Sequence, residues 1–218
     1  SGFEKVNYQE PADFYVINTC SVTENADKEA KKLIRKAKKT NPESAVVIIG
    51  CYAQLKPEKI ALIDGVDLVL GAEEKFNLIE HLDKISYQKR ATKIFQSPIS
   101  DTKNFIPSYS YGERTRSYLK VQDGCDYTCS FCTIPQARGK SRSNTVKKTK
   151  EIAQQISNTN IREIVLTGVN IGDFGKGSSE NFLDLIQELD SVKNIDRIRI
   201  SSIEPNLLTD EIIKFCFS

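Results

Sequence analysis

The sequence YLKVQDGCDYTCSFCTIP, residues 118–135, joins an apolar segment to a cluster of three cysteines. The segment YLKVQ predicts a β-strand. Cys125, Cys129 and Cys132 follow it in the spacing C-x3-C-x2-C. Open α/β folds place their ligand sites at the carboxyl ends of strands. The stretch therefore predicts an α/β fold with a thiolate site at one edge of its sheet.

Alternating strand and helix patterns continue on the C-terminal side of the cysteines. Strands are predicted over residues 163–167 and 197–201, helices over 145–157, 181–189 and from 210 onward, and a flexible glycine-rich loop over 168–179. Three successive βα units are typical of a parallel sheet or barrel. The third unit is cut by the end of the sequence, so we expect only part of a barrel.

The N-terminal part of the chain shows the same alternation. Strands are predicted over residues 14–18, 45–50 and 66–70, and helices over 24–39, 57–63 and 73–85. This order predicts a doubly wound parallel α/β domain over residues 1–85. Scattered Pro, Ser and Tyr over 86–116 predict a linker with one short strand near 92–95. The second domain, with the first βα units of a partial barrel, is expected over 117–218.

The composition is that of a soluble globular protein, with 39% hydrophobic and 28% charged residues. No apolar run approaches the roughly 18 residues of a membrane span, and we read no secretory leader. We therefore expect a cytoplasmic protein with reduced thiols. The sequence has no methionine, so we expect the natural N-terminus to lie upstream. Net charge is only +2, but residues 28–39 and 138–150 are basic runs; each is either a solvated surface or a contact for an anionic ligand.

Three clustered thiols have several chemical interpretations. A structural zinc site needs four ligands, and the one histidine, His81, lies in a charged helical pattern that we expect at the surface. The tight spacing of two-cluster ferredoxins is absent. A 4Fe-4S cluster on three thiolates leaves one iron open to a substrate, which is the interpretation we favour over zinc.

The remaining cysteines lie elsewhere in the chain. Cys20 and Cys51 each directly follow a predicted parallel strand, so we expect them at one edge of the first sheet. They are either ligands or small buried hydrophobic residues. Cys216 lies in an apolar helical pattern and is expected in the core.

The C-x3-C-x2-C spacing, with Phe131 before its last cysteine, resembles the radical S-adenosylmethionine superfamily. The segments NTCSVTENAD, IIGCYAQ, VQDGCDYTCSFCTIPQARG and IVLTGVNIGDFG, in this order, resemble its methylthiotransferase family. The resemblance implies an N-terminal α/β domain, a radical barrel and a C-terminal RNA-binding domain beyond this sequence. It also implies that the free iron chelates S-adenosylmethionine, which one electron cleaves to a 5′-deoxyadenosyl radical.

The resemblance assigns roles to individual residues. It places one 4Fe-4S cluster on Cys125, Cys129 and Cys132, and an auxiliary 4Fe-4S cluster on Cys20, Cys51 and a third cysteine upstream of this sequence. The auxiliary cluster therefore lacks one ligand here. Position and resemblance together predict five contacts for S-adenosylmethionine: Phe131, Gly168, Asn170, Ser202 and Glu204.

Several stretches favour one branch of the family. TCSVTENAD, ARGKSRS and RISSIEP resemble the branch that adds a methylthio group at C2 of threonylcarbamoyladenosine in tRNA. The alternatives are action on isopentenyladenosine or on a ribosomal-protein aspartate and, in another class, a non-catalytic metal-cluster RNA-binding module. We expect a monomer whose partners are a tRNA anticodon stem-loop and a flavodoxin- or ferredoxin-type electron donor. Arg138, Lys140 and Arg142 are candidate phosphate contacts.

Overall fold

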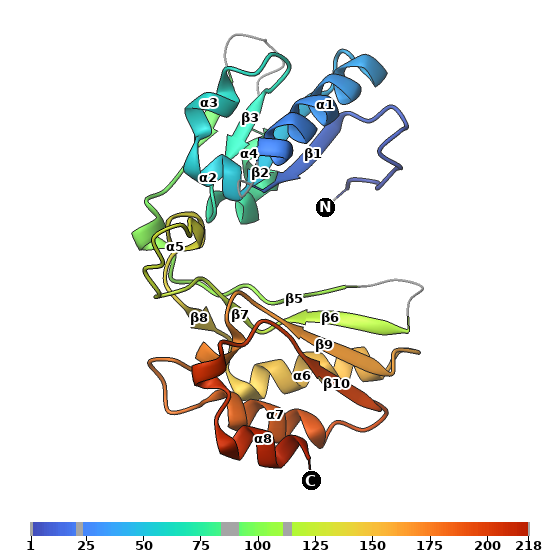
Figure 1. Cartoon of the computed structure of the whole chain (residues 1–218). Coiled ribbons are helices and arrows are strands. Elements are labelled where there is room, and N and C mark those ends of the chain that lie inside the picture. Colours follow the sequence, from blue (N-terminus) through green and yellow to red (C-terminus); the bar gives the residue numbers. More distant parts are fainter. Residues whose placement is uncertain (1, 21–23, 84–91, 111–114, 218) are drawn as a thin grey trace. The chain divides into compact units, whose positions relative to one another are not determined.

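The computed structural model describes residues 2–20, 24–83, 92–110 and 115–217, and divides into two compact units (Figure 1). The first unit comprises Ser1–Thr102 with Gln136–Arg138, and the second comprises Lys103–Pro135 with Gly139–Ser218. Each unit has its own four-stranded sheet. The chain is thus mixed α/β throughout, as predicted.

The sheet of the first unit is parallel, with strand order β1-β2-β3-β4. Its strands are β1 (Phe14–Thr19), β2 (Ala45–Gly50), β3 (Leu68–Leu70) and β4 (Lys93–Phe95). The predicted third strand is shorter than expected. The short strand expected near residues 92–95 is confirmed and completes this sheet.

Helices cover both faces of this sheet. They are α1 (Glu24–Thr40), α2 (Cys51–Leu55), α3 (Pro57–Ala61), the 3₁₀ turn η1 (Glu74–Asn77) and α4 (Leu78–Asp83). Val46 and Ile48 of β2 pack in a cluster with residues of α1, α2 and α3, whereas Val47 packs with Leu82 of α4. Successive strand residues point to opposite faces, so an apolar run such as β2 is buried on both sides. The predicted doubly wound arrangement is confirmed.

The sheet of the second unit has the order β10-β9-β6-β5. Strands β6 (Arg116–Lys120), β9 (Glu163–Thr167) and β10 (Arg197–Ile200) are parallel, and β5 (Ser108–Tyr109) is an antiparallel edge strand that we did not predict. A separate antiparallel pair joins β7 (Gln122–Asp123) to β8 (Arg142–Ser143). Because β6, β9 and β10 run in the same direction, the segments that follow them emerge at one edge of the sheet.

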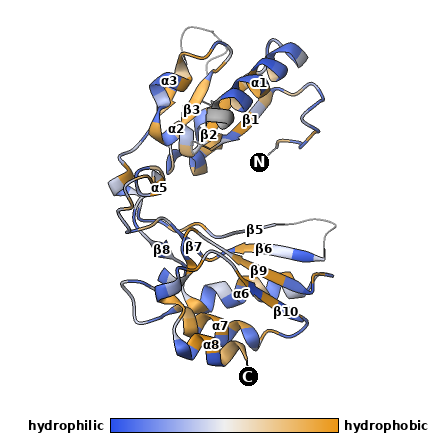
Figure 2. Ribbon diagram, in the orientation of Figure 1, coloured by the Kyte–Doolittle hydropathy of each residue, from blue (hydrophilic) through white to orange (hydrophobic). Residues whose placement is uncertain are grey.

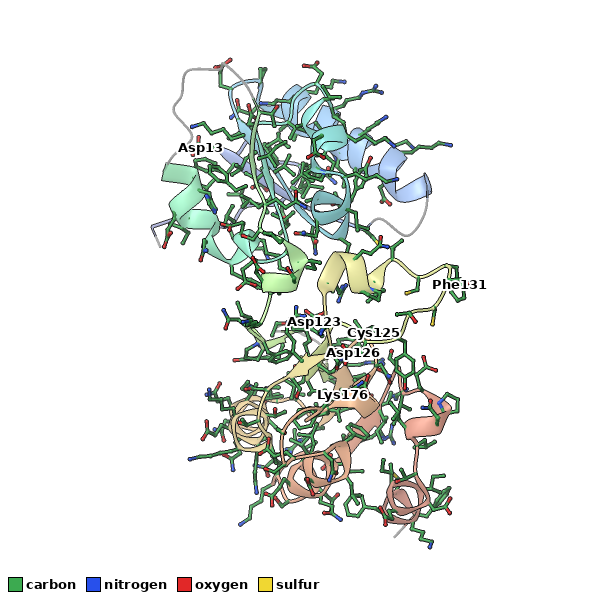
Figure 3. All side chains as sticks on the ribbon, turned by 90° about the vertical axis from the view of Figure 1, so that its left-hand side faces the viewer. Asp13, Asp123, Cys125, Asp126, Phe131 and Lys176 are labelled. Carbon is green, nitrogen blue, oxygen red and sulfur yellow. The ribbon has the colours of Figure 1, made fainter. Side chains whose placement is uncertain are left out.

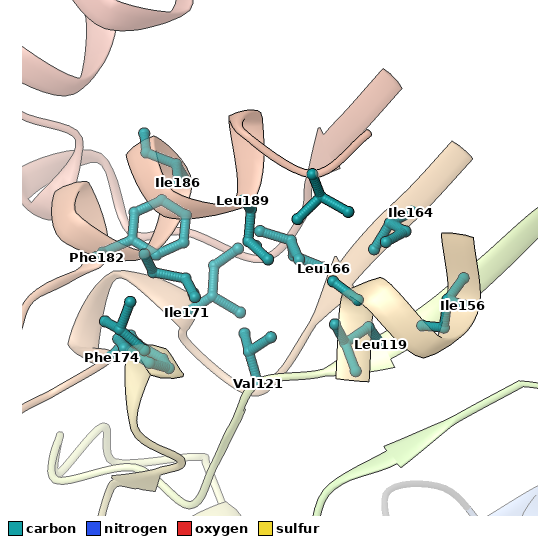
Figure 4. Packing of buried hydrophobic residues seen from close by; sticks show 14 of the residues in the cluster. Leu119, Val121, Ile156, Ile164, Leu166, Ile171, Phe174, Phe182, Ile186 and Leu189 are labelled. Carbon is teal, nitrogen blue, oxygen red and sulfur yellow. The ribbon is translucent and has the colours of Figure 1, made fainter. Parts of the chain in front are cut away.

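The helices of the second unit complete the three predicted βα units. They are α6 (Val146–Ser157), α7 (Phe182–Asp190) and α8 (Asp210–Cys216), and the 3₁₀ turns η3 (Ile171–Asp173) and η4 (Pro205–Leu207) lie between them. Two further elements involve the first unit. The 3₁₀ turn η2 (Ile99–Asp101) belongs to it, and α5 (Ile134–Arg138) begins in the second unit and ends in the first. Apolar side chains of β6 and β9 pack against those of α6 and α7 (Figure 4). Figure 2 shows β9 as hydrophobic and α1 as largely hydrophilic.

Two predictions of exposure were wrong. His81 is only 5% exposed, with its Nε2 atom 2.8 Å from Glu74 Oε2 and its ring stacked on Phe95. The charged helical pattern gave no sign that β4 would cover this side chain. Cys216 is exposed rather than in the core, because α8 buries Ile212 instead.

Within the described ranges, no helix combines the length and apolar composition that a bilayer crossing requires.

Candidate functional site

The cysteine loop is closed at its base by backbone pairing. Gln122 of β7 pairs with Ser143 of β8, and Asp123 pairs with Arg142. Beyond this pair, the N–H of Cys125 donates to the carbonyl of Gly139 at 3.0 Å. The loop therefore begins and ends at one fixed point near the carboxyl end of β6.

Glycine at position 124 makes this closure possible. Gly124 has φ 75°, and a Cβ atom there would lie 2.0 Å from the carbonyl oxygen of Lys140 and 2.7 Å from that of Gly139. L-residues with side chains rarely adopt this conformation, and no side chain fits so close to backbone. The close approach of the two loop ends therefore requires glycine directly before Cys125.

The three cysteines differ in exposure. Cys125 and Cys132 are partly buried and Cys129 is exposed, while Phe131 is 89% exposed and extends from the loop (Figure 3). Burial raises the pKa of the Cys125 thiol, and Asp173 and the other two thiols raise it further, against a lowering hydrogen bond from the Tyr127 backbone.

This donor set fits a cationic iron–sulfur cluster, because three thiolates that repel one another are stabilised by bound iron. Across the described part of the chain, however, no three His, Cys, Asp or Glu side chains are already gathered as metal ligands. Ligation of a cluster by these cysteines therefore stays a prediction.

A charged pair links the cysteine loop to the glycine-rich segment after β9. Asp126 Oδ2 lies 3.1 Å from Lys176 Nζ, and Asp126 Oδ1 accepts a hydrogen bond from the Ser141 N–H at 3.0 Å (Figure 3). The Ser141 N–H is the main cause of the lowered pKa of Asp126, and Lys176 adds to it. The glycine-rich segment, expected to be a flexible loop, contains η3 and buries Phe174.

The predicted S-adenosylmethionine contacts after β9 and β10 lie together. Asn170 Oδ1 accepts a hydrogen bond from the Glu204 N–H at 3.2 Å, and the Ile171 N–H donates to the Ser202 carbonyl at 3.1 Å. Ser202 has φ 43°, a strained conformation for a residue other than glycine. The side chains of Ser202 and Glu204 are exposed, whereas Asn170 is 2% exposed and also donates to Asp173.

Sequence reasoning missed Gln122, which joins the loop base to the residues after β9. Its side chain is fully buried and its Oε1 atom accepts hydrogen bonds from the N–H groups of Val169 and Asn170, both at 2.9 Å. A polar residue at the end of an apolar strand, directly before the cysteines, was the available signal.

The two N-terminal cysteines follow neighbouring strands in register. Thr19 pairs with Gly50, so Cys20 and Cys51 leave the first sheet at the same edge, as expected. Gly50 has φ 103°, and a Cβ atom there would lie 2.3 Å from the Thr19 carbonyl oxygen. The close approach of these two strand ends therefore requires glycine before Cys51.

The basic residues after the cysteines have mixed environments. Arg142 donates from Nε to the Asn104 carbonyl and from Nη1 to the Lys140 carbonyl, each at 3.1 Å, and its Nη2 lies 3.4 Å from Asp123 Oδ2. It therefore stabilises the loop base. Arg138, which belongs to the first unit, donates from Nε to Cys51 Sγ at 3.5 Å. The side chain of Lys140 is exposed.

Comparison with known proteins gives two matching family models. Residues 1–71 match the Uncharacterized protein family UPF0004, and residues 119–216 match the Radical SAM superfamily. The second match begins in β6 and includes all three cysteines of the loop.

Curated relatives match almost the whole chain. It is 38% identical over 224 residues to Threonylcarbamoyladenosine tRNA methylthiotransferase MtaB of Bacillus subtilis (98% of this chain, 48% of the relative). It is 36% identical over 220 residues to the protein of that name from Aquifex aeolicus (100% and 53%). It is 31% identical over 228 residues to tRNA-2-methylthio-N(6)-dimethylallyladenosine synthase of Rickettsia akari (98% and 51%). The chain thus spans about half the length of these relatives. With both family models in the expected order, it belongs to the radical S-adenosylmethionine methylthiotransferase family.

Proposed function

We propose that the chain is part of a transferase that adds a methylthio group at C2 of N6-threonylcarbamoyladenosine next to the anticodon of tRNA. The observation that carries this proposal is the closed three-cysteine loop at the same sheet edge as the hydrogen-bonded segments after β9 and β10. The names of the Bacillus subtilis and Aquifex aeolicus relatives support the choice of nucleoside.

The proposed reaction places the cluster on Cys125, Cys129 and Cys132. When bound and reduced, the cluster would supply the electron for reductive cleavage of S-adenosylmethionine, the radical chemistry needed to remove the C2 hydrogen of the base. The residues around it bind and orient the sulfonium substrate. In this proposal the exposed ring of Phe131 packs on S-adenosylmethionine, and the exposed Glu204 carboxylate accepts hydrogen bonds from its amino or hydroxyl groups.

A second site in the first unit is proposed to provide the sulfur. Cys20 and Cys51 would hold an auxiliary 4Fe-4S cluster with a cysteine from outside this sequence, and a second S-adenosylmethionine would donate the methyl group. We further propose a flavodoxin- or ferredoxin-type protein as the electron donor, and a cytoplasmic monomer as the working form.

One exposed helix face supports a nucleic acid substrate. The side chains of Lys28, Lys31, Lys32, Arg35 and Lys39 lie on the solvent side of α1, and none has a carboxylate partner among the described side chains. At about 1.5 Å per residue these cations extend over about 16 Å of helix, enough to contact several phosphates. Ala30, Ile34 and Ala37 on the opposite face are buried.

Charge reversal on α1 tests this surface. In the full-length protein, Lys32→Glu and Arg35→Glu should each weaken binding of a tRNA anticodon stem-loop several-fold, and should reduce the slope of log affinity against log salt by about one. Lys193→Glu, the same change at an exposed lysine of the second unit, is the matched control. Equal effects of all three variants would show that only overall charge matters.

The substrate is tested in cells that lack the full-length gene. Mass spectrometry of tRNA nucleosides should show loss of the methylthio form of threonylcarbamoyladenosine, with its unmodified precursor accumulating. Loss of the methylthio form of isopentenyladenosine instead would assign the protein to the branch represented by the Rickettsia akari relative. Normal levels of both methylthio nucleosides in these cells would contradict a tRNA substrate.

A further inference from the structure

The side-chain amide of Gln122 uses its whole hydrogen-bonding capacity inside the second unit. Its Oε1 atom accepts from the N–H groups of Val169 and Asn170, both at 2.9 Å. Its Nε2 atom donates toward the Asp123 carbonyl at 3.1 Å, the Gly124 carbonyl at 2.8 Å and Ser141 Oγ at 2.9 Å. The two ends of one buried amide thus bind two different segments.

A primary amide is the group that this position requires. The oxygen side needs an acceptor for two backbone N–H groups, and the nitrogen side needs a donor for two carbonyls. A carboxylate would keep the first function and lose the second. An apolar side chain would lose both and leave buried backbone groups unpaired, which is destabilising.

The segment on the oxygen side is built to fit Gln122. A Cβ atom on Gly168 would lie 2.9 Å from both the backbone oxygen and the Oε1 atom of Gln122, so this glycine permits the contact. Asn170 continues the connection through its Oδ1 atom to the Glu204 N–H. One hydrogen-bonded path therefore runs from the cysteine loop past the end of β9 to the segment after β10.

We propose that Gln122 is a positioning residue that holds the Gly168–Asn170 turn at a fixed place relative to the cysteine loop. This inference rests on the proposed function, in which the loop carries the cluster and the turn borders the methionyl part of S-adenosylmethionine. Gln122 itself is fully buried, so in this proposal it acts through the turn and not by direct contact with substrate. Its effect is on the geometry with which a cluster-bound ligand meets the turn.

The test compares two substitutions in the full-length, anaerobically reconstituted protein. Gln122→Glu keeps the hydrogen bonds from Val169 and Asn170 but places a carboxylate oxygen next to the Gly124 carbonyl oxygen, which repels it. Gln122→Leu removes the hydrogen bonds to both segments. Each variant should retain its iron, because the cysteines and the hydrogen bond from the Cys125 N–H to the Gly139 carbonyl are unchanged. Each should nevertheless bind S-adenosylmethionine about tenfold or more weakly. The electron paramagnetic resonance change that S-adenosylmethionine induces in the reduced cluster should diminish in parallel. Gln155→Glu, at an exposed position of α6, is the matched control.

The outcomes separate positioning from folding. Unchanged affinity in both variants would overturn the inference, and so would equal losses of iron and of S-adenosylmethionine binding, which indicate loss of the loop itself. If Gln122→Leu does not fold, Gln122→Asn decides, because its shorter amide cannot reach both segments.

Hydrogen exchange keeps this test independent of the proposed function. The amides of Val169 and Asn170 should exchange faster in Gln122→Leu and remain protected in Gln122→Glu. If wild-type protein forms no 5′-deoxyadenosine, the proposed function fails while this measurement still decides whether Gln122 holds the turn. Unchanged exchange in Gln122→Leu would overturn the role of Gln122.

Discussion

Replacement of Gly124 by alanine should abolish incorporation of iron at the cysteine loop and, with it, cleavage of S-adenosylmethionine. The added Cβ atom would lie 2.0 Å from the Lys140 carbonyl oxygen, a backbone atom that cannot rotate away. The loop ends would have to separate, which breaks the hydrogen bond from the Cys125 N–H to the Gly139 carbonyl. Iron and sulfide content after reconstitution, and 5′-deoxyadenosine formation under dithionite, measure the effect.

Substitution of a second glycine, Gly177, distinguishes the effect of the steric clash at position 124 from the effect of a strained backbone conformation. Gly177 has φ 85°, close to the 75° of Gly124, but a Cβ atom there would meet nothing within 4 Å. Gly177→Ala carries only the conformational cost of a left-handed residue, about 1 kcal/mol, and should keep its iron and activity. Equal behaviour of the two variants would mean that the close approach at Gly124 has no role in cluster binding.

Cys129→Ala should reduce S-adenosylmethionine cleavage below detection while leaving the fold intact. The side chain is exposed, and the backbone carbonyl that accepts from the Cys132 N–H is unaffected by the substitution. Two remaining thiols leave the cluster with too few ligands to stay bound. The assay is 5′-deoxyadenosine release from anaerobic full-length protein, with circular dichroism to report the fold.

Cys216→Ala is the control for this change, because Cys216 is also an exposed thiol but lies on α8, away from the loop in sequence. It should retain full activity and full iron content. Cleavage by Cys129→Ala at the wild-type rate would remove Cys129 from the site. Binding of a single zinc ion in place of iron by the wild-type protein would replace the radical interpretation with the alternative zinc site.

Periodicity in the sequence was sufficient to predict most of the two sheets. The apolar runs AVVIIG and EIVLT became β2 and β9 because a strand buried on both faces needs continuous apolar residues. The run FYVIN became the edge strand β1, which is buried on one face only and leaves Val16 41% exposed on the other. Parallel strands then place their following residues at one edge, which is why Cys20 and Cys51 could be assigned to the same edge. The short strand β5 was missed, because two residues carry no detectable period.

The sequence by itself determined the alternation of strands and helices, the cysteine spacing and the family, since each is encoded in residues close together along the chain. Only the tertiary structure decided which side chains meet distant partners: the buried Gln122 with the Asn170 N–H, Arg142 with the exposed Asn104 carbonyl, and the buried His81 with Glu74 and Phe95. Gln122 and Asn170 are 48 positions apart, and no local pattern records such a pairing. Packing of the strands brings these groups together, and the high cost of an unpaired buried polar atom then fixes the contact.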